Sequence, residues 1–111
     1  MKNKYASCGL NYDLIIEKFH DINEYEAVVN AYLDDEFFKQ LKDMLIDEDY
    51  AMAKDAVKGL YILASDLYLY PLYETLLEIY EDLEYETYTD LMNHHDLMIK
   101  AYDRIRGMFN A

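Results

Sequence analysis

Apolar residues recur at helical spacing along most of the chain. Between Ile22 and Leu33 they follow one another at intervals of three, three, one, three and one residues, the pattern of an amphipathic helix. Comparable stripes continue until a break at "IDEDY" (46–50) and then resume. Together the stripes predict helices over 11–20, 21–33, 34–46, 50–67, 71–83 and 86–109.

Short polar joints separate the predicted helices. Asp34 fits a cap or a joint between two segments, and Asp47 or Asp49 is able to cap the helix after "IDEDY". Short connections make successive helices antiparallel neighbours. We therefore expect an all-α fold over 11–109, an antiparallel up-down four-helix bundle with a short leading N-terminal helix. Residues 1–10 are expected to form a flexible leader.

Composition and charge narrow the classes of function. Hydrophobic residues make up 53% of the 111 residues, while three glycines and one proline are too few for the turns of an all-β domain. The net charge of −13 opposes binding to nucleic acid or to anionic lipid, and leaves open an acidic face that docks a basic partner. No apolar run approaches the length of a membrane span, and Cys8 stands alone in a polar segment without a signal-peptide core. We expect a cytoplasmic domain that binds neither nucleic acid nor membrane.

The stretch "KDAVKGLYIL" (54–63) places a glycine in the middle of a predicted helix. Glycine at such a position costs roughly 1 kcal/mol relative to alanine. The core face of this helix is expected to hold Ala53, Ala56, Val57, Leu60, Leu63 and Ala64. The outward side carries five residues at i, i+3, i+4, i+7 and i+11, here named the Gly59 ridge: Asp55, Lys58, Gly59, Ile62 and Asp66. An outward glycine leaves bare backbone that another molecule is able to approach closely.

The segment "AKDAVKG" (53–59) resembles the active helix of histidine phosphotransfer (HPt) domains, which reads His-x-x-Lys-Gly. In this register the match comprises Ala56, Val57, Lys58 and Gly59. The stretches "DEFFKQLKDMLIDEDY" and "DLYLYPLYETLLEIYEDLEYETYTDLM" on either side also resemble the family, so that the resemblance covers about residues 11–108. It implies a four-helix bundle that docks response-regulator receiver domains or histidine kinases. In the family, the equivalent of Lys58 helps to neutralise phosphoryl oxygens, and that of Gly59 lets the partner approach.

Asp55 stands where the family has its phosphoacceptor histidine. A carboxylate is a poor substitute for that imidazole, and phosphorylation would give a reactive acyl phosphate. The positions a turn or two later often hold small or polar residues in the family, but here they hold Tyr61, Ile62 and Leu63. Lys58 is expected to pair with Asp55 at i, i+3, an ordinary surface pair that also fits a helix with no docking role. The resemblance therefore implies a degenerate member that is not an enzyme.

Other residues with chemical potential form weaker patterns. Glu17 and His20 have the Glu-x-x-His spacing of di-iron bundles, but the chain has no second copy. Adjacent His94 and His95 point about 100° apart on a helix, and neither is followed by Lys-Gly at i+3 and i+4. We expect His95 to lie buried or at the bundle edge with a hydrogen-bond partner, and His94 to be exposed. No phosphate-binding loop or nucleophile motif is present, and no catalytic residue, metal or cofactor is predicted.

The sequence thus predicts a pseudo-HPt signalling adaptor that binds a receiver or kinase partner through the Gly59 ridge. One alternative is a structural bundle that self-associates, as a homodimer burying Ile62 and a tyrosine cluster. This cluster comprises Tyr61, Tyr68, Tyr70 and Tyr73. The four tyrosines equally fit packing at the bundle edge with wet hydroxyls. A third alternative is a phosphocarrier that uses another residue.

Overall fold

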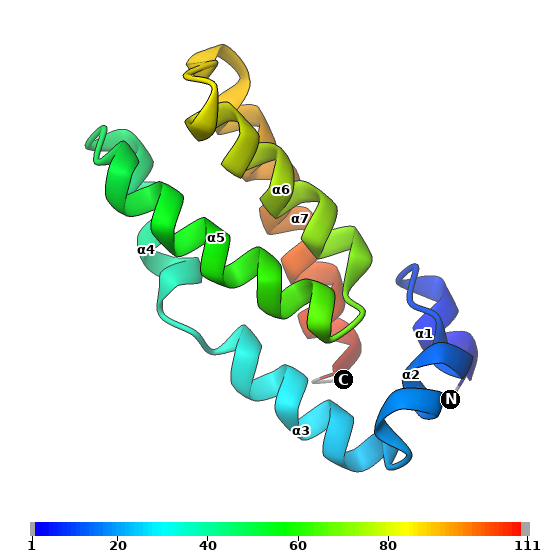
Figure 1. Ribbon diagram of the computed structural model, residues 1–111. Coiled ribbons are helices and arrows are strands. Elements are labelled where there is room, and N and C mark those ends of the chain that lie inside the picture. Colours follow the sequence, from blue (N-terminus) through cyan, green and yellow to red (C-terminus); the bar gives the residue numbers. More distant parts are fainter. Residues whose placement is uncertain (1, 110–111) are drawn as a thin grey trace.

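The chain folds into helices joined by short turns. The computed structural model describes residues 2–109, and this part holds seven α-helices, one 3-10 helix and no strand (Figure 1). Their bounds are α1 (Lys2–Ser7), α2 (Tyr12–Phe19), α3 (Ile22–Leu33), α4 (Phe37–Ile46), α5 (Tyr50–Asp66), α6 (Tyr70–Glu84), η1 (Tyr88–Asp90) and α7 (Leu91–Phe109). The all-α prediction is confirmed. None of the described helices is both long enough and apolar enough to span a membrane.

The helices α4 to α7 run up and down beside one another. α4 packs against α5, α5 along α6, and α6 along α7 (Figure 1). α3 lies against α7, where the Tyr102 hydroxyl donates a hydrogen bond to the Leu33 carbonyl oxygen at 2.5 Å. α1 and α2 lie together at the end of the molecule where α7 finishes, and the whole measures 40 × 23 × 20 Å.

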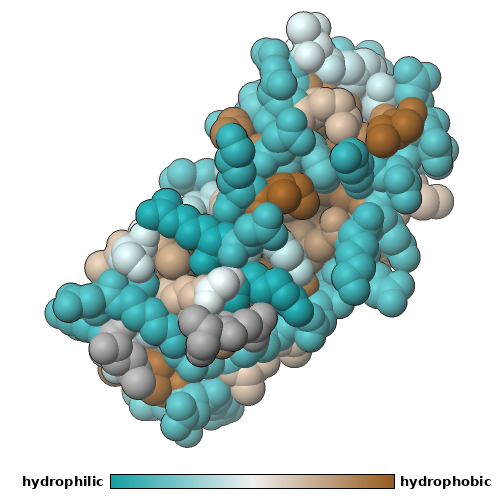
Figure 2. All heavy atoms as spheres, turned by 180° about the vertical axis from the view of Figure 1, so that it is seen from behind, coloured by the Kyte–Doolittle hydropathy of each residue, from teal (hydrophilic) through white to brown (hydrophobic). Residues whose placement is uncertain are grey.

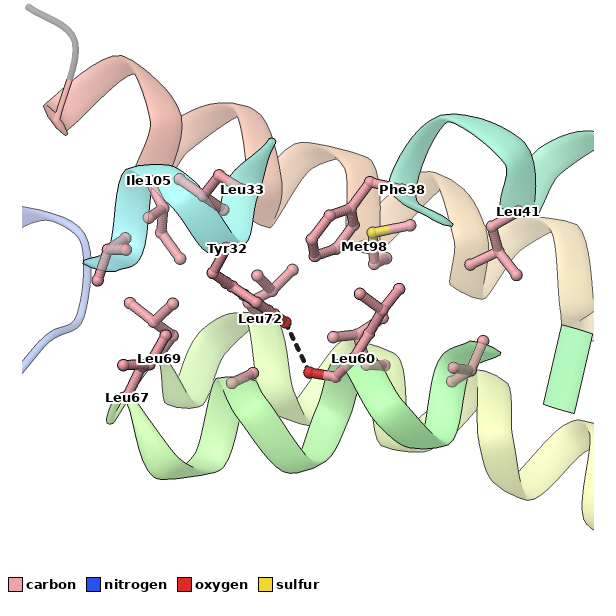
Figure 3. Packing of buried hydrophobic residues seen from close by; sticks show 14 of the residues in the cluster. Tyr32, Leu33, Phe38, Leu41, Leu60, Leu67, Leu69, Leu72, Met98 and Ile105 are labelled. Carbon is pink, nitrogen blue, oxygen red and sulfur yellow. Dashed lines mark hydrogen bonds between the residues drawn. The ribbon is translucent and has the colours of Figure 1, made fainter. Parts of the chain in front are cut away.

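One apolar core runs between the helices. Figure 3 shows side chains of α3, α4 and α7 facing those of α5 and α6, with Phe38 pointing toward Met98. Tyr32 crosses the core from α3, and its hydroxyl donates to the carbonyl oxygen of Leu60 on α5 at 2.6 Å. Burial of these apolar side chains stabilises the fold by about 25 cal/mol for each Å² removed from water.

Three interhelical turns close in the same way and without glycine. Glu48, Tyr68 and Glu86 each adopt a positive φ, of 59°, 59° and 57°, just after a helix. In each turn the next N–H donates to the carbonyl oxygen five positions back, at 2.9 Å: Asp49 to Met44, Leu69 to Ala64, and Thr87 to Asp82. This Schellman arrangement satisfies carbonyl groups that the helix end leaves free. The turn at Glu48 sets the start of α5. The expected side-chain cap of α5 is absent, because Asp47 is the C-cap of α4 and Asp49 makes no side-chain capping bond.

Residues 2–10, expected to form a flexible leader, contain α1 and pack against the rest of the chain. Tyr5 in α1 is fully buried, and its hydroxyl donates a hydrogen bond to Glu26 at 2.7 Å. Its ring packs edge-to-face with that of Phe109, with the ring centroids 5.7 Å apart. Arg104 of α7 also donates a hydrogen bond to the Ser7 carbonyl oxygen at 2.5 Å. A helix of six residues is too short to show a periodic apolar stripe, which is why the pattern did not reveal it.

Candidate functional site

The Gly59 ridge lies on the solvent side of α5. All five of its residues are exposed, and Ile62 keeps 44% of its surface. The opposite face of α5 is buried and consists of Ala53, Ala56, Val57, Leu60 and Ala64. Because the helix repeats every 3.6 residues, the ridge residues all point away from the buried face and form one continuous strip along the helix.

Gly59 is not required by the packing of the fold. A Cβ atom built at this position would meet nothing within 4 Å. The backbone there is helical with negative φ, so it does not need glycine for its conformation either. The residue therefore leaves an open stretch of main chain in the middle of the ridge.

The expectation that Leu63 belongs to the core is wrong. Leu63 is 46% exposed, and Met52, which the apolar pattern did not indicate as a surface residue, is 59% exposed. Leu63 lies one turn after Gly59 and Met52 two turns before it, both on the same side of the ridge. A full helical wheel shows Leu63 to be turned about 100° from Ile62, at the margin between the two faces. The apolar part of the ridge is therefore wider than expected.

The expected ion pair between Asp55 and Lys58 does not form. Instead, Lys54 pairs with Glu84 of α6, and this hydrogen bond raises the pKa of Lys54 and lowers that of Glu84. The nearby charge of Lys58 also helps to lower the pKa of Glu84. Within residues 2–109 the Asp55 carboxylate has no hydrogen bond and no ion pair within 4 Å, so it stays open to solvent.

His94 is paired rather than exposed, contrary to expectation. Its Nδ1 donates a hydrogen bond to Asp82 of α6, and its Nε2 lies 3.7 Å from Glu78. The Thr87 hydroxyl donates to the same Asp82 carboxylate at 3.2 Å. The hydrogen bond to Asp82, with the charges of Asp82 and Glu78, raises the pKa of His94. This cluster joins α6 to α7, and its two carboxylates would repel a phosphoryl group.

His95 is buried as expected, but it lacks the expected hydrogen-bond partner. It is 2% exposed, and neither ring nitrogen has a partner in the described part of the chain. The Asp96 carboxylate is 4.0 Å from Nδ1, too far for a hydrogen bond. Burial lowers the pKa of His95, so the ring is neutral near pH 7.

The tyrosine cluster packs against itself beside α5. Tyr61 meets Tyr73 and Tyr80 with ring centroids 6.0 and 5.3 Å apart, and Tyr70 meets Tyr68 and Tyr73 at 6.1 and 6.4 Å. All of these pairs are edge-to-face, the arrangement that aromatic quadrupoles favour. Tyr70 is exposed and the others are half-buried, so the geometry favours packing at the bundle edge.

Metal-ligating side chains do not gather in the described residues. No group of three or more His, Cys, Asp or Glu side chains among residues 2–109 is placed to hold an ion. Glu17 and His20 are both exposed at the end of α2. The Gly59 ridge on α5 is therefore the strongest candidate for a functional site.

Comparison with known proteins finds no relative of this chain. No protein family, no curated protein and no solved structure matches it.

Proposed function

We propose that this protein is a signalling adaptor of the pseudo-HPt type, which binds a receiver domain or a histidine kinase through the Gly59 ridge. The observation that carries the proposal is an exposed glycine in the middle of a well-anchored helix, with nothing within 4 Å of its missing Cβ. Since such a glycine is unfavourable for the helix itself, close approach by another molecule supplies a reason for it. An apolar centre at Ile62 flanked by charges at Asp55, Lys58 and Asp66 suits a protein interface.

The helix arrangement supports the resemblance on which this proposal rests. If α3 and α4 are counted as one helix broken at 34–36, then α5, α6 and α7 complete an up-down bundle of four. α5 is then the second helix of that bundle, as the active helix is in the HPt family. Packed between α4 and α6, α5 keeps the ridge face open to solvent.

The proposed role is binding without phosphoryl transfer. Asp55 offers a carboxylate where the family offers an imidazole, and none of the described residues is placed to activate it as a nucleophile. A fixed negative charge at this position is available to a partner, although one carboxylate carries less charge than a phosphoryl group. The adaptor would therefore compete for receivers or hold them near a kinase.

Binding to a panel of receiver domains from the same organism tests the proposal. We expect at least one receiver to bind, and a Gly59→Arg change to abolish that binding by placing a long side chain on the docking path. The matched control is Gly107→Arg on α7, where a Cβ likewise meets nothing within 4 Å. Loss of binding in both variants, or in neither, would contradict a site at the ridge.

A self-associating bundle is the second candidate, because Met52, Ile62 and Leu63 together leave apolar surface on α5. Exposed apolar groups that lie side by side are common at interfaces between copies of a chain. Sizing over a range of concentrations distinguishes the two candidates. A dimer that Gly59→Arg dissociates, together with no receiver binding, would favour self-association.

A further inference from the structure

A groove opens between α4 and α7, the least closed seam of the helix stack. Each helix from α4 to α6 packs against the next one in the chain. By contrast, the outer helices α4 and α7 meet at the rings of Phe38 and Tyr102, whose centroids are 4.8 Å apart. The groove has a volume of about 520 Å³, within the range of small-molecule sites. Figure 2 looks at the face on which α4 and α7 lie and shows apolar atoms recessed among polar side chains.

The floor of the groove is mainly apolar, with the imidazole of His95 and the hydroxyl of Tyr102 as its polar groups. Phe38, Ile99 and Tyr102 line it together with His95. Both ring nitrogens of His95 are buried and lack a partner among the described residues. Because these nitrogens are shielded from solvent, a guest in the groove would contact the apolar surface of the floor instead. The floor therefore suits a guest with an apolar body.

The two rims of the groove carry opposite charges. Lys39 and Lys42 line it from α4, and Asp96 and Asp103 line it from α7. In the part of the chain that the structure describes, no ion pair joins one rim to the other. An anion would face the two aspartates and the net charge of −13, while a cation would face the two lysines. A molecule with both charges and an apolar middle matches the two rims at once.

We propose that this groove binds a small zwitterion with an apolar body, of the size of a dipeptide with apolar side chains. Its carboxylate lies toward Lys39 and Lys42, its ammonium toward Asp96 and Asp103, and its apolar side chains cover Ile99. The groove lies on the α4–α7 seam rather than on the exposed strip of α5. Ligand binding here is therefore independent of docking at the Gly59 ridge.

Titration with phenylalanyl-leucine, followed by calorimetry and by NMR of the histidine rings, tests the proposal. The chain has three histidines, so the rings give separate reporters. We expect saturable binding that shifts the His95 resonances and leaves those of His20 and His94 in place. Acetylating the ligand's amine or amidating its carboxylate should each weaken binding about fivefold or more, and glycylglycine should bind more weakly still.

Variants of the groove give a second, independent test. Ile99→Trp should fill the groove and abolish binding, and Lys39→Glu should weaken it without touching the core, because Lys39 is exposed. Lys18→Glu on α2, equally exposed, is the matched control and should bind as the wild type does, as should Gly59→Arg. No saturation at millimolar ligand, equal binding of the acetylated peptide, or shifts at His20 or His94 instead of His95 would overturn the proposal.

Discussion

The hydroxyl of Tyr32 donates a hydrogen bond to the carbonyl oxygen of Leu60, the residue that follows Gly59, at 2.6 Å. A second tyrosine, Tyr25, makes the same kind of bond to the carbonyl oxygen of Leu67, also at 2.6 Å. Both donors lie on α3. Leu60 lies within α5, and Leu67 directly follows its last residue. The inner side of α5 is thus held at two points while its outer side stays free, which gives the Gly59 ridge a rigid support.

Removing the Tyr32 hydroxyl should lower stability. Burial raises the pKa of Tyr32, so the hydroxyl stays protonated and remains a donor at all ordinary pH values. We expect Tyr32→Phe to lower the free energy of unfolding by about 1 kcal/mol, measured by urea denaturation. Tyr85→Phe, at a residue that is 72% exposed, is the control and should change little. An equal effect of both changes would show that the bond to Leu60 is unimportant.

Replacing Gly59 by alanine should stabilise the protein. The added Cβ meets nothing within 4 Å, and alanine is the better helix former. We expect the free energy of unfolding to rise by about 0.5–1 kcal/mol in Gly59→Ala. A loss of stability would mean that the glycine serves the fold, and it would remove the main reason for assigning it to an interface.

In the turn after α6, introducing a glycine should stabilise the protein. Glu86 is exposed and has a φ of 57°, a conformation that glycine adopts without strain. Glu86→Gly is expected to raise the free energy of unfolding by about 1 kcal/mol, since relief of strain outweighs the added freedom of the unfolded chain. The same change at Glu81, inside α6, should lower it by a similar amount. Thermal and urea unfolding of the two variants provide the check.

The two adjacent histidines should give opposite dependences of stability on pH. The folded-state pKa of His95 lies below the ordinary value of about 6.5, so the unfolded chain takes up the proton first and stability falls as the pH drops below about 6.5. Lys42 adds to this lowering of the pKa and Asp96 opposes it. The folded-state pKa of His94 is raised, so its stabilising effect is complete below about pH 6.5 and is lost as the pH rises through that raised value.

Urea unfolding between pH 5.5 and 8 separates these two contributions. His95→Leu should remove the loss of stability on the acid side, and His94→Gln should remove the decline on the alkaline side. The difference between each variant and the wild type is the quantity to follow, because the many carboxylates then cancel. A His94→Gln variant that keeps the alkaline decline would contradict the assigned role of Asp82.

The first helix should contribute strongly to stability. Tyr5 is fully buried, and its ring contacts Phe109 while its hydroxyl bonds to Glu26. We expect Tyr5→Ala to cost about 3–5 kcal/mol in the free energy of unfolding, as for other large buried rings. Lys2→Ala, at an exposed residue of the same helix, should have little effect. A small effect of Tyr5→Ala would restore the original expectation of a loose leader.

The sequence predicted the all-α class because long apolar stripes dominate α3 to α7, and it placed the five ridge residues on one exposed side of α5. The sequence placed the joints near Glu48, Tyr68 and Glu86, but it did not predict their positive φ, because no glycine stands there. It also missed α1, which is too short for a stripe. Leu63 was expected in the core because it is apolar, but residue type alone does not show that it lies at the margin between the buried and exposed faces.

Pairing of charged side chains was the least predictable feature. Lys58 was expected to pair along its own helix, yet it is Lys54 that reaches across to Glu84 on α6. His94 likewise finds Asp82 on the neighbouring helix. The partner in each case lies on another element, and sequence spacing carries no information on such contacts.

The most direct test of the central claim is to map by NMR where a receiver domain touches the protein. If the Gly59 ridge is the docking surface, amide resonances at the exposed positions of α5 between Asp55 and Asp66 should shift or broaden on addition of the receiver. Resonances of the exposed side of α7, including Gly107, should stay in place, and the Gly59→Arg variant should show no change. Shifts confined to other helices, or a bound receiver that leaves α5 unperturbed, would contradict the account.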